Sequence, residues 1–270
     1  MATSLCHYLI GADRTKPVIL FLHGFLGSRG DWIDLVKPFS DDYRCLLVDL
    51  PGHGENRSLP ENDYTIQGCT QALLHLFDKL DIDRANILGY SMGGRLALYF
   101  AVTYPDRCHR VILESSSPGL KTKLERDERV GNDEELAAKL ELEGLDVFLK
   151  EWYDKPIFAT LKEHPGKLSR LLEQRRQSDP AGLALSLRIM GTGKQQSLWD
   201  RLNEINLPLL LLAGEQDIKF SGIASAMADL CPTAEVCIIA NAGHNVHIEQ
   251  PEQFVRVALD FLAGKRGLHE

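Results

Sequence analysis

Several features that would assign a chain to a particular class are missing here. The 270 residues hold no apolar run near the ~18 needed to cross a bilayer. Residues 1–15 lack the basic segment and long apolar core of a signal peptide. Six cysteines occur without the spacing of metal ligands or a disulfide framework, which indicates small core residues in a reducing compartment. We therefore expect a cytoplasmic protein without membrane insertion.

Charge and motifs exclude further classes. A formal net charge of −8 argues against a general nucleic-acid surface. The chain has no Rossmann fingerprint, P-loop or cluster of metal ligands, so the sequence predicts chemistry without a cofactor or metal. A hydrophobic content of 44% with 25% charged residues is typical of a globular protein. A monomer and a small homo-oligomer both fit this composition.

Short apolar runs rich in β-forming residues alternate with longer stretches of helical period. This alternation predicts an α/β fold, with a mostly parallel central sheet flanked by helices. The predicted strands are Val18–Leu22, Tyr43–Asp49, Ala85–Tyr90, Arg110–Glu114, Leu207–Leu212 and Glu235–Ile239. The predicted helices are Thr65–Leu80, residues 92–104, Ser221–Leu230 and Pro251–Leu262.

The strand signal stops between about residues 118 and 200, where the chain is charged and helical in period. We interpret this stretch as a helical lid inserted into a single domain that spans residues 1–270. The alternative is that it simply continues the α/β layers.

The sharpest motif is a G-x-S-x-G sequence at Gly89–Gly93, between a predicted strand and a predicted helix. In α/β hydrolases such a turn strains the serine backbone and exposes the hydroxyl, and small neighbours let other chains pass close by. Ser91 is therefore the predicted nucleophile or base. The alternative is a serine that only caps a helix.

A serine hydroxyl needs a histidine to take its proton, and in this fold the chain order is serine, acid, histidine. Asp217 follows the predicted strand after the insertion, and His244 lies in a late glycine-rich turn. Glu215 is the alternative acid and His247 the alternative base. The predicted triad is Ser91, Asp217 and His244.

Developing negative charge requires backbone N–H donors near the serine. The amide of Met92 begins the helix after Ser91, and the amide of Phe25 follows the first predicted strand. Both are candidates for an oxyanion hole. We interpret His23 and His53 as structural residues of their turns.

Arg95 lies four positions after Ser91 and should share its helix face. A guanidinium buried so close to a nucleophile suits a substrate that carries a carboxylate. A salt bridge to an acid of the insertion is the alternative. If further arginines of the insertion converge on Ser91, they would form a pocket that binds a polyanion. These arginines are Arg126, Arg129, Arg175 and Arg176.

With these residues in hand, residues 17–262 closely resemble the synthase family of menaquinone biosynthesis that makes 2-succinyl-6-hydroxy-2,4-cyclohexadiene-1-carboxylate. The general motifs that carry the resemblance are HGFLGS (His23–Ser28), DLPGHG (Asp49–Gly54) and NAGHNVHIEQP (Asn241–Pro251). The more specific ones are GYSMGGR (Gly89–Arg95), PGL (Pro118–Leu120), EWYDKPIF (Glu151–Phe158), SLRIMGTGKQQSLW (Ser186–Trp199) and GEQDIKF (Gly214–Phe220).

The resemblance implies a lyase of menaquinone or phylloquinone biosynthesis. In this reaction Ser91 removes a proton from the enolpyruvyl-bearing cyclohexene substrate, a small polyanionic carboxylate, and pyruvate is eliminated. The substrate-binding residues that it implies are Arg95, Arg129, either Arg175 or Arg176 with Arg175 favoured, Tyr90, Trp152 and Phe220. Lys121 stands where some relatives have glutamine, and it either contacts the substrate or adds a further cation.

Two other functions fit parts of the pattern. A serine hydrolase, acting as an esterase, thioesterase or C–C hydrolase on a small carboxylate-bearing substrate, would use the same triad. A ligand receptor on the same fold would not need the triad at all, and the complete Ser91, Asp217 and His244 set disfavours it.

Overall fold

The computed structural model describes residues 5–265, and a seven-stranded sheet lies at its centre. The strand order is β1-β3-β2-β4-β5-β6-β7. Strand β1 is antiparallel to β3, and the other neighbours are parallel, which confirms the predicted mostly parallel sheet. The strands are β1 (His7–Ile10), β2 (Val18–Leu22), β3 (Arg44–Val48), β4 (Ala85–Tyr90), β5 (Cys108–Glu114), β6 (Leu209–Gly214) and β7 (Ala234–Ile239).

The central strands are buried on both faces, as strands of a parallel sheet covered by helices must be. All five residues of β2 are buried. Leu20 and Leu22 pack into one apolar cluster, whereas Ile19 and Phe21 pack into another on the opposite face. The continuous apolar run of β2 is therefore divided between two cores by the period of two of a strand.

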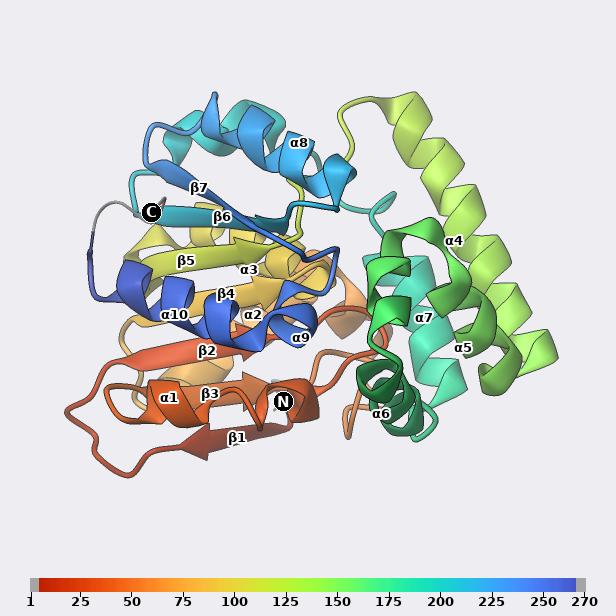
Figure 1. The fold of residues 1–270 in the computed structure, drawn as a ribbon, viewed down its shortest axis with the longest axis horizontal. Helices are drawn as coiled ribbons and strands as arrows, with labels where there is room; N and C mark the ends of the chain where they lie inside the picture. Colours follow the sequence, from red (N-terminus) through yellow and green to blue (C-terminus); the bar gives the residue numbers. More distant parts are fainter. Residues whose placement is uncertain (1–4, 266–270) are drawn as a thin grey trace.

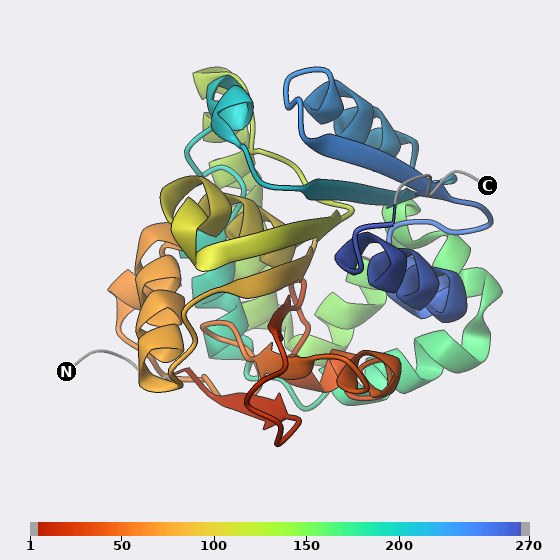
Figure 2. The ribbon, with the colours of Figure 1, turned by 90° about the vertical axis from the view of Figure 1, so that its left-hand side faces the viewer.

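Helices cover both faces of the sheet (Figures 1 and 2). Residues of α2, α3 and α8 belong to the first cluster, and residues of α10 belong to the second. The bounds of these helices and of two short ones are α1 (Lys37–Ser40), α2 (Ile66–Lys79), α3 (Met92–Thr103), α8 (Ile218–Ala228), α9 (Val246–Glu249) and α10 (Pro251–Leu262).

Four further helices lie between β5 and β6 in the chain and are called the inserted helices below. They are α4 (Lys123–Glu143), α5 (Leu145–Asp154), α6 (Pro165–Arg175) and α7 (Pro180–Met190). Thr122 and Glu125 form a capping box at the start of α4, and Gly144 ends that helix with φ 83°. The inserted helices form a third apolar cluster, and Figure 1 shows them beyond the carboxyl ends of the parallel strands.

One close backbone contact seats α7 on the rest of the molecule. A Cβ atom on Gly52 would lie 2.2 Å from the carbonyl oxygen of Gly182. Only glycine permits this approach, and Gly52 also has φ +80°. The turn after β3 is thus shaped to receive an inserted helix.

No helix among residues 5–265 is both long and apolar enough to span a bilayer. Within the same residues, no group of histidine, cysteine and acidic side chains could hold a metal ion.

Candidate active site

Ser91 lies at the turn between β4 and α3, with φ 49° and ψ −106°. A positive φ strains a residue other than glycine, so this conformation must be held by its surroundings. A Cβ atom on Gly93 would lie 2.3 Å from the carbonyl oxygen of Leu22, and one on Gly89 would lie 2.5 Å from the carbonyl oxygen of Gly93. Both glycines of the motif are therefore required by backbone packing.

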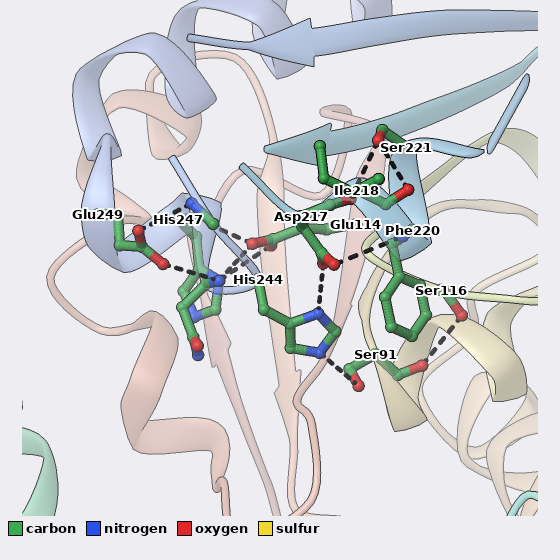
Figure 3. A network of polar contacts seen from close by, with 12 residues as sticks. Ser91, Glu114, Ser116, Asp217, Ile218, Phe220, Ser221, His244, His247 and Glu249 are labelled. Carbon is green, nitrogen blue, oxygen red and sulfur yellow. Dashed lines mark hydrogen bonds and ion pairs between the residues drawn. The ribbon is translucent and has the colours of Figure 1, made fainter. Parts of the chain in front are cut away.

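The structure brings the three predicted triad residues together (Figure 3). His244 Nε2 lies 3.2 Å from Ser91 Oγ, and His244 Nδ1 lies 2.7 Å from Asp217 Oδ2. The carboxylate accepts a hydrogen bond from Nδ1–H, which leaves Nε2 free to accept the serine proton. His244 and Asp217 are almost completely buried. These contacts can make the Ser91 oxygen basic.

Neither alternative residue takes part in this chain of contacts. Glu215 is exposed and accepts a hydrogen bond from the amide of Asn241. His247 Nδ1 lies 2.8 Å from Glu114 Oε1, in a buried pair behind the triad. The ring of His247 also packs against Tyr90, with 4.7 Å between centroids.

Glu249 holds the turn that carries His244. Its Oε2 accepts a hydrogen bond from the amide of Gly243 at 2.8 Å, and its Oε1 accepts one from the amide of Asn245 at 3.1 Å. One buried carboxylate thus fixes the backbone on both sides of His244 (Figure 3). Glu114 and Glu249 were not predicted as site residues: Glu249 lies inside the motif Asn241–Pro251, but nothing in the spacing of either residue indicates these contacts.

Phe25 and Met92, the two predicted amide donors, both line the same pocket as Ser91. A Cβ atom on Gly24 would lie 3.6 Å from Ser91 Cβ and 2.5 Å from the Tyr90 ring. The segment that carries Phe25 therefore runs directly beside the serine, and Met92 follows the serine at the start of α3. This placement suits an oxyanion hole.

The pocket has a volume of about 660 Å³ and lies between the sheet and the inserted helices. Its apolar wall includes three of the predicted side chains. The Phe220 ring lies 4.7 Å from the His244 ring, and the Tyr90 ring lies 5.4 Å from it. Trp152 stacks on Phe148 with 5.6 Å between ring centroids.

Arg95 lines this pocket and is 8% exposed. Its Nη1 donates to Gln195 Oε1 at 2.9 Å, and its Nη2 donates to the carbonyl oxygen of Met190 at 2.9 Å. Among residues 5–265 it forms no ion pair, so the alternative of a salt bridge to an inserted acid is wrong. Burial and the nearby Arg129 lower the pKa of Arg95 to about 10.

Two more predicted arginines line the pocket with acidic partners. Arg175 makes a bidentate pair with Asp31, at 2.6 and 2.7 Å. Burial opposes the charge of Arg175, but Asp31 outweighs this effect and raises its pKa. Arg129 donates from Nε to Asp133 Oδ1 at 2.8 Å. Burial raises the pKa of Asp133 despite this contact.

Three other cations suggested by the sequence lie outside the pocket lining. The Lys121 ammonium group sits over the Trp199 ring, 4.1 Å from its centroid, so a contact of Lys121 with the substrate stays a prediction. Arg126 donates to the backbone carbonyls of Leu120 and Lys121. Arg176 is exposed and pairs with Asp146, so of the two adjacent arginines only Arg175 faces the pocket.

Sequence reasoning missed several polar residues of the lining. Burial, followed by the nearby Arg129, lowers the pKa of Lys155, whose ammonium group lies 4.0 Å from the Trp152 ring centroid. Ser115 Oγ and Asn245 Oδ1 are buried without a hydrogen-bond partner among the described residues. The signal for Lys155, Lys219 and Asn245 was present, because all three lie inside motifs that carry the family resemblance. The missed lining residues include Ser115, Asn132, Lys139, Lys155, Lys219 and Asn245.

Comparisons with known proteins agree with this geometry. The family model described as alpha/beta hydrolase fold matches residues 17–251. A putative 2-succinyl-6-hydroxy-2,4-cyclohexadiene-1-carboxylate synthase of Bacillus subtilis (strain 168) is 39% identical over 254 residues, which cover 93% of this chain and 92% of the relative. The chain belongs to this synthase family of α/β hydrolases.

Other members of the synthase family give the same result. The 2-succinyl-6-hydroxy-2,4-cyclohexadiene-1-carboxylate synthase of Pectobacterium atrosepticum is 32% identical, over 92% of this chain and 94% of the relative. The solved structure of MenH from S. aureus is 35% identical and superposes with a TM-score of 0.91, covering 98% of this chain and all of that one. The synthase family thus matches in sequence and in fold over almost the whole chain.

Proposed function

We propose that this protein is a 2-succinyl-6-hydroxy-2,4-cyclohexadiene-1-carboxylate synthase. Its substrate would be 2-succinyl-5-enolpyruvyl-6-hydroxy-3-cyclohexene-1-carboxylate, from which it eliminates pyruvate. The relatives named above support the reaction, and the observation that carries the proposal is Arg95. This buried guanidinium, one helical turn from Ser91, has only neutral hydrogen-bond partners among the described residues.

The proposed step is an elimination. Ser91 Oγ removes a ring proton while His244 Nε2 accepts the serine proton, and Asp217 stabilises the resulting imidazolium. The electrons of the broken C–H bond at C2 form a C2–C3 double bond, and the existing C3–C4 double bond shifts to C4–C5. The bond between the ring and the enolpyruvyl oxygen breaks, and the leaving enolate takes up a proton to become pyruvate. The Phe25 and Met92 amides would stabilise the charge that develops as the proton leaves.

The charge of the pocket supports this substrate. The substrate carries three carboxylates, on the ring, on the succinyl group and on the enolpyruvyl group. Arg95, Arg129, Arg175 and Lys155 all line the pocket. We propose that these cations hold the carboxylates, and that Tyr90, Trp152 and Phe220 contact the ring. In this proposal the inserted helices serve as a lid that separates the reaction from water.

The test is pyruvate release from purified protein and the enolpyruvyl substrate, followed by coupling to lactate dehydrogenase. We expect turnover well above the spontaneous decay of the substrate. Ser91→Ala should lower the rate by about 10³-fold or more, because it removes the base. Release by the wild type no faster than by Ser91→Ala would refute the assignment.

The distances within the triad also suit a serine hydrolase acting on a small acidic ester or thioester. An activated acyl ester distinguishes the two functions. A synthase should show no burst and little turnover of the ester, whereas a hydrolase should show an acyl-enzyme burst and efficient turnover. Labelling of Ser91 by a fluorophosphonate is expected in both cases and does not discriminate.

A further inference from the structure

Arg95 and Gln195 form a buried pair at the edge of the pocket, and one partner is uncharged. Gln195 is 2% exposed, and its Oε1 accepts the hydrogen bond from Arg95 Nη1 at 2.9 Å. The second contact of the guanidinium, to the Met190 carbonyl oxygen, is also with a neutral group. These two contacts fix the orientation of the guanidinium without cancelling its charge.

The other two arginines of the pocket are held differently. Arg175 is paired through two hydrogen bonds with the Asp31 carboxylate, and Arg129 contacts the Asp133 carboxylate. A carboxylate partner neutralises a buried arginine, whereas an amide partner does not. Arg95 has no carboxylate hydrogen-bond partner, and the attraction of the nearby Asp133 is outweighed by burial and by the repulsion of Arg129, so its charge is balanced least among the three.

A buried positive charge without a counter-charge destabilises the fold, and a bound anion would relieve this cost. Burial lowers the pKa of Arg95 to about 10, which reflects the unfavourable environment of its charge. A guanidinium has five N–H donors, and the two contacts with Gln195 and Met190 leave further donors for a ligand. A carboxylate bound there would supply the missing counter-charge.

We propose that Gln195 is a positioning residue that makes Arg95 selective for a carboxylate ligand, because its amide orients the guanidinium and leaves the charge unneutralised. The identity of that ligand as the synthase substrate rests on the proposed function. The preference for an anion rests on the contacts of Arg95 and Gln195 alone.

Glutamate at position 195 has nearly the same shape and tests the role of charge. Gln195 Nε2 has no hydrogen-bond partner among residues 5–265, so replacing it by an oxygen breaks no contact of the described chain. Gln195→Glu would instead pair with Arg95 as a carboxylate and fill the place of the ligand's charge. The variant should fold at least as stably as the wild type, which separates its effect from simple damage.

The matched control is Gln196→Glu. It introduces the same charge one residue along, at an exposed position. The ligand for binding measurements is 2-(3-carboxypropionyl)benzoate, the stable aromatic analogue of the product named for the relatives, and its dimethyl ester serves as the neutral counterpart. Isothermal calorimetry measures the affinity of both, and the rate of Ser91 labelling by an uncharged fluorophosphonate reports whether the triad is intact.

We expect Gln195→Glu to weaken binding of the dicarboxylate on the order of 10- to 100-fold, because Arg95 loses its free charge. Affinity for the dimethyl ester, Ser91 labelling and the free energy of unfolding should not decrease. In turnover, KM should rise more than kcat falls. Gln196→Glu should match the wild type in every measurement.

Unchanged dicarboxylate affinity in Gln195→Glu would overturn the inference, and so would failure of the wild type to bind the dicarboxylate. A parallel fall in Ser91 labelling would also overturn it, since that result indicates general damage. The outcome is separable from the proposed function. If Gln195→Glu binds the dicarboxylate more weakly but the wild type releases no pyruvate, the inference holds and the synthase assignment is refuted. If the wild type turns over and Gln195→Glu has unchanged kinetics, the synthase assignment holds and the inference is refuted.

Discussion

At the scale of single residues, buried polar side chains with specific partners distinguish this molecule from a generic α/β protein. His23 and His53 are fully buried beside each other, with 5.1 Å between ring centroids. His23 Nε2 accepts a hydrogen bond from the amide of Leu50, and His53 Nδ1 donates to the carbonyl oxygen of Pro51. Both support the turns beside the serine, as the sequence predicted for them.

Burial makes the fold sensitive to acid through His53. Desolvation, with a smaller contribution from His23, lowers the pKa of His53 well below its ordinary value. The unfolded chain then binds a proton below about pH 6.5 that the folded chain does not, so stability falls as the pH drops through that value. His53→Asn should reduce the loss of unfolding free energy between pH 7 and pH 5, by up to about 1.4 kcal/mol per pH unit.

Urea unfolding at the two pH values measures this effect. His75→Asn, on an exposed position of α2, is the control and should leave the acid-induced loss as it is in the wild type. An equal loss in wild type and His53→Asn would show that His53 does not contribute to acid sensitivity.

Residue types and spacing were sufficient to predict the members of the triad, because the strand–serine–helix turn and the order of the three residues are strong constraints. The partners of the arginines were not predictable. Asp31 and Arg175 are 144 positions apart, and Arg95 and Gln195 are 100 apart. Only the folded chain determines which acid or amide meets which guanidinium.

At the scale of elements, predictions were most accurate where turn residues or a proline mark both ends of an apolar segment. Strands β2 and β4 and helix α10 have the predicted bounds, since apolar residues and turn residues define both ends. Strand β1 was missed, because His7–Ile10 is a short edge strand with little burial and no apolar alternation. Strand β6 begins at Leu209 rather than Leu207 and extends to Gly214, two residues beyond the predicted end.

The turn between β7 and α9 depends on the carboxylate of Glu249. Glu249→Ala leaves the amides of Gly243 and Asn245 without their acceptor, at about 1–3 kcal/mol for each buried donor. We expect a loss of unfolding free energy of that order and a slower fluorophosphonate reaction at Ser91, since His244 loses its fixed backbone. Glu252→Ala, nearby and exposed, should change neither quantity. Labelling of Ser91 in Glu249→Ala at the wild-type rate would contradict the role of Glu249 in holding the turn that carries His244.

Replacement of two helical glycines by alanine should change the stability of the protein in opposite directions. Gly131 lies within α4 with no atom within 4 Å of an added Cβ, so Gly131→Ala should stabilise the protein by about 0.5–1 kcal/mol through backbone entropy. Gly93→Ala places its Cβ 2.3 Å from the Leu22 carbonyl oxygen and should prevent the serine turn from forming. Thermal unfolding of both variants tests the pair. Destabilisation by Gly131→Ala would contradict the open environment of that position.

At the scale of the whole molecule, the inserted helices are joined to the rest of the chain by ion pairs of very different burial. The Arg175–Asp31 side chains are each 6% exposed, whereas the Arg170–Asp34 side chains are 68% and 69% exposed. Burial alone would raise the pKa of Asp31, yet the adjacent Arg175 outweighs it and holds that pKa below its ordinary value.

These two pairs give a matched prediction. Asp31→Ala leaves a buried guanidinium without its counter-charge and should lower the free energy of unfolding by about 3–5 kcal/mol. Asp34→Ala removes an exposed partner and should lower it by less than about 1 kcal/mol. Urea denaturation of both variants provides the comparison. Equal effects would show that the buried pair does not anchor the inserted helices.

Asp31 and Arg175 pair in the folded protein but lie far apart in the sequence, and this limits which segments can be exchanged between related enzymes. A chimera that takes residues 123–190 from another α/β hydrolase keeps Asp31 but loses Arg175, and an acid at the pocket wall is then left facing the incoming substrate. Its negative charge would repel the carboxylates that the pocket is built to receive. Successful exchange of the segment therefore requires that position 31 be exchanged with it, so the smallest transferable unit of specificity is discontinuous in the gene.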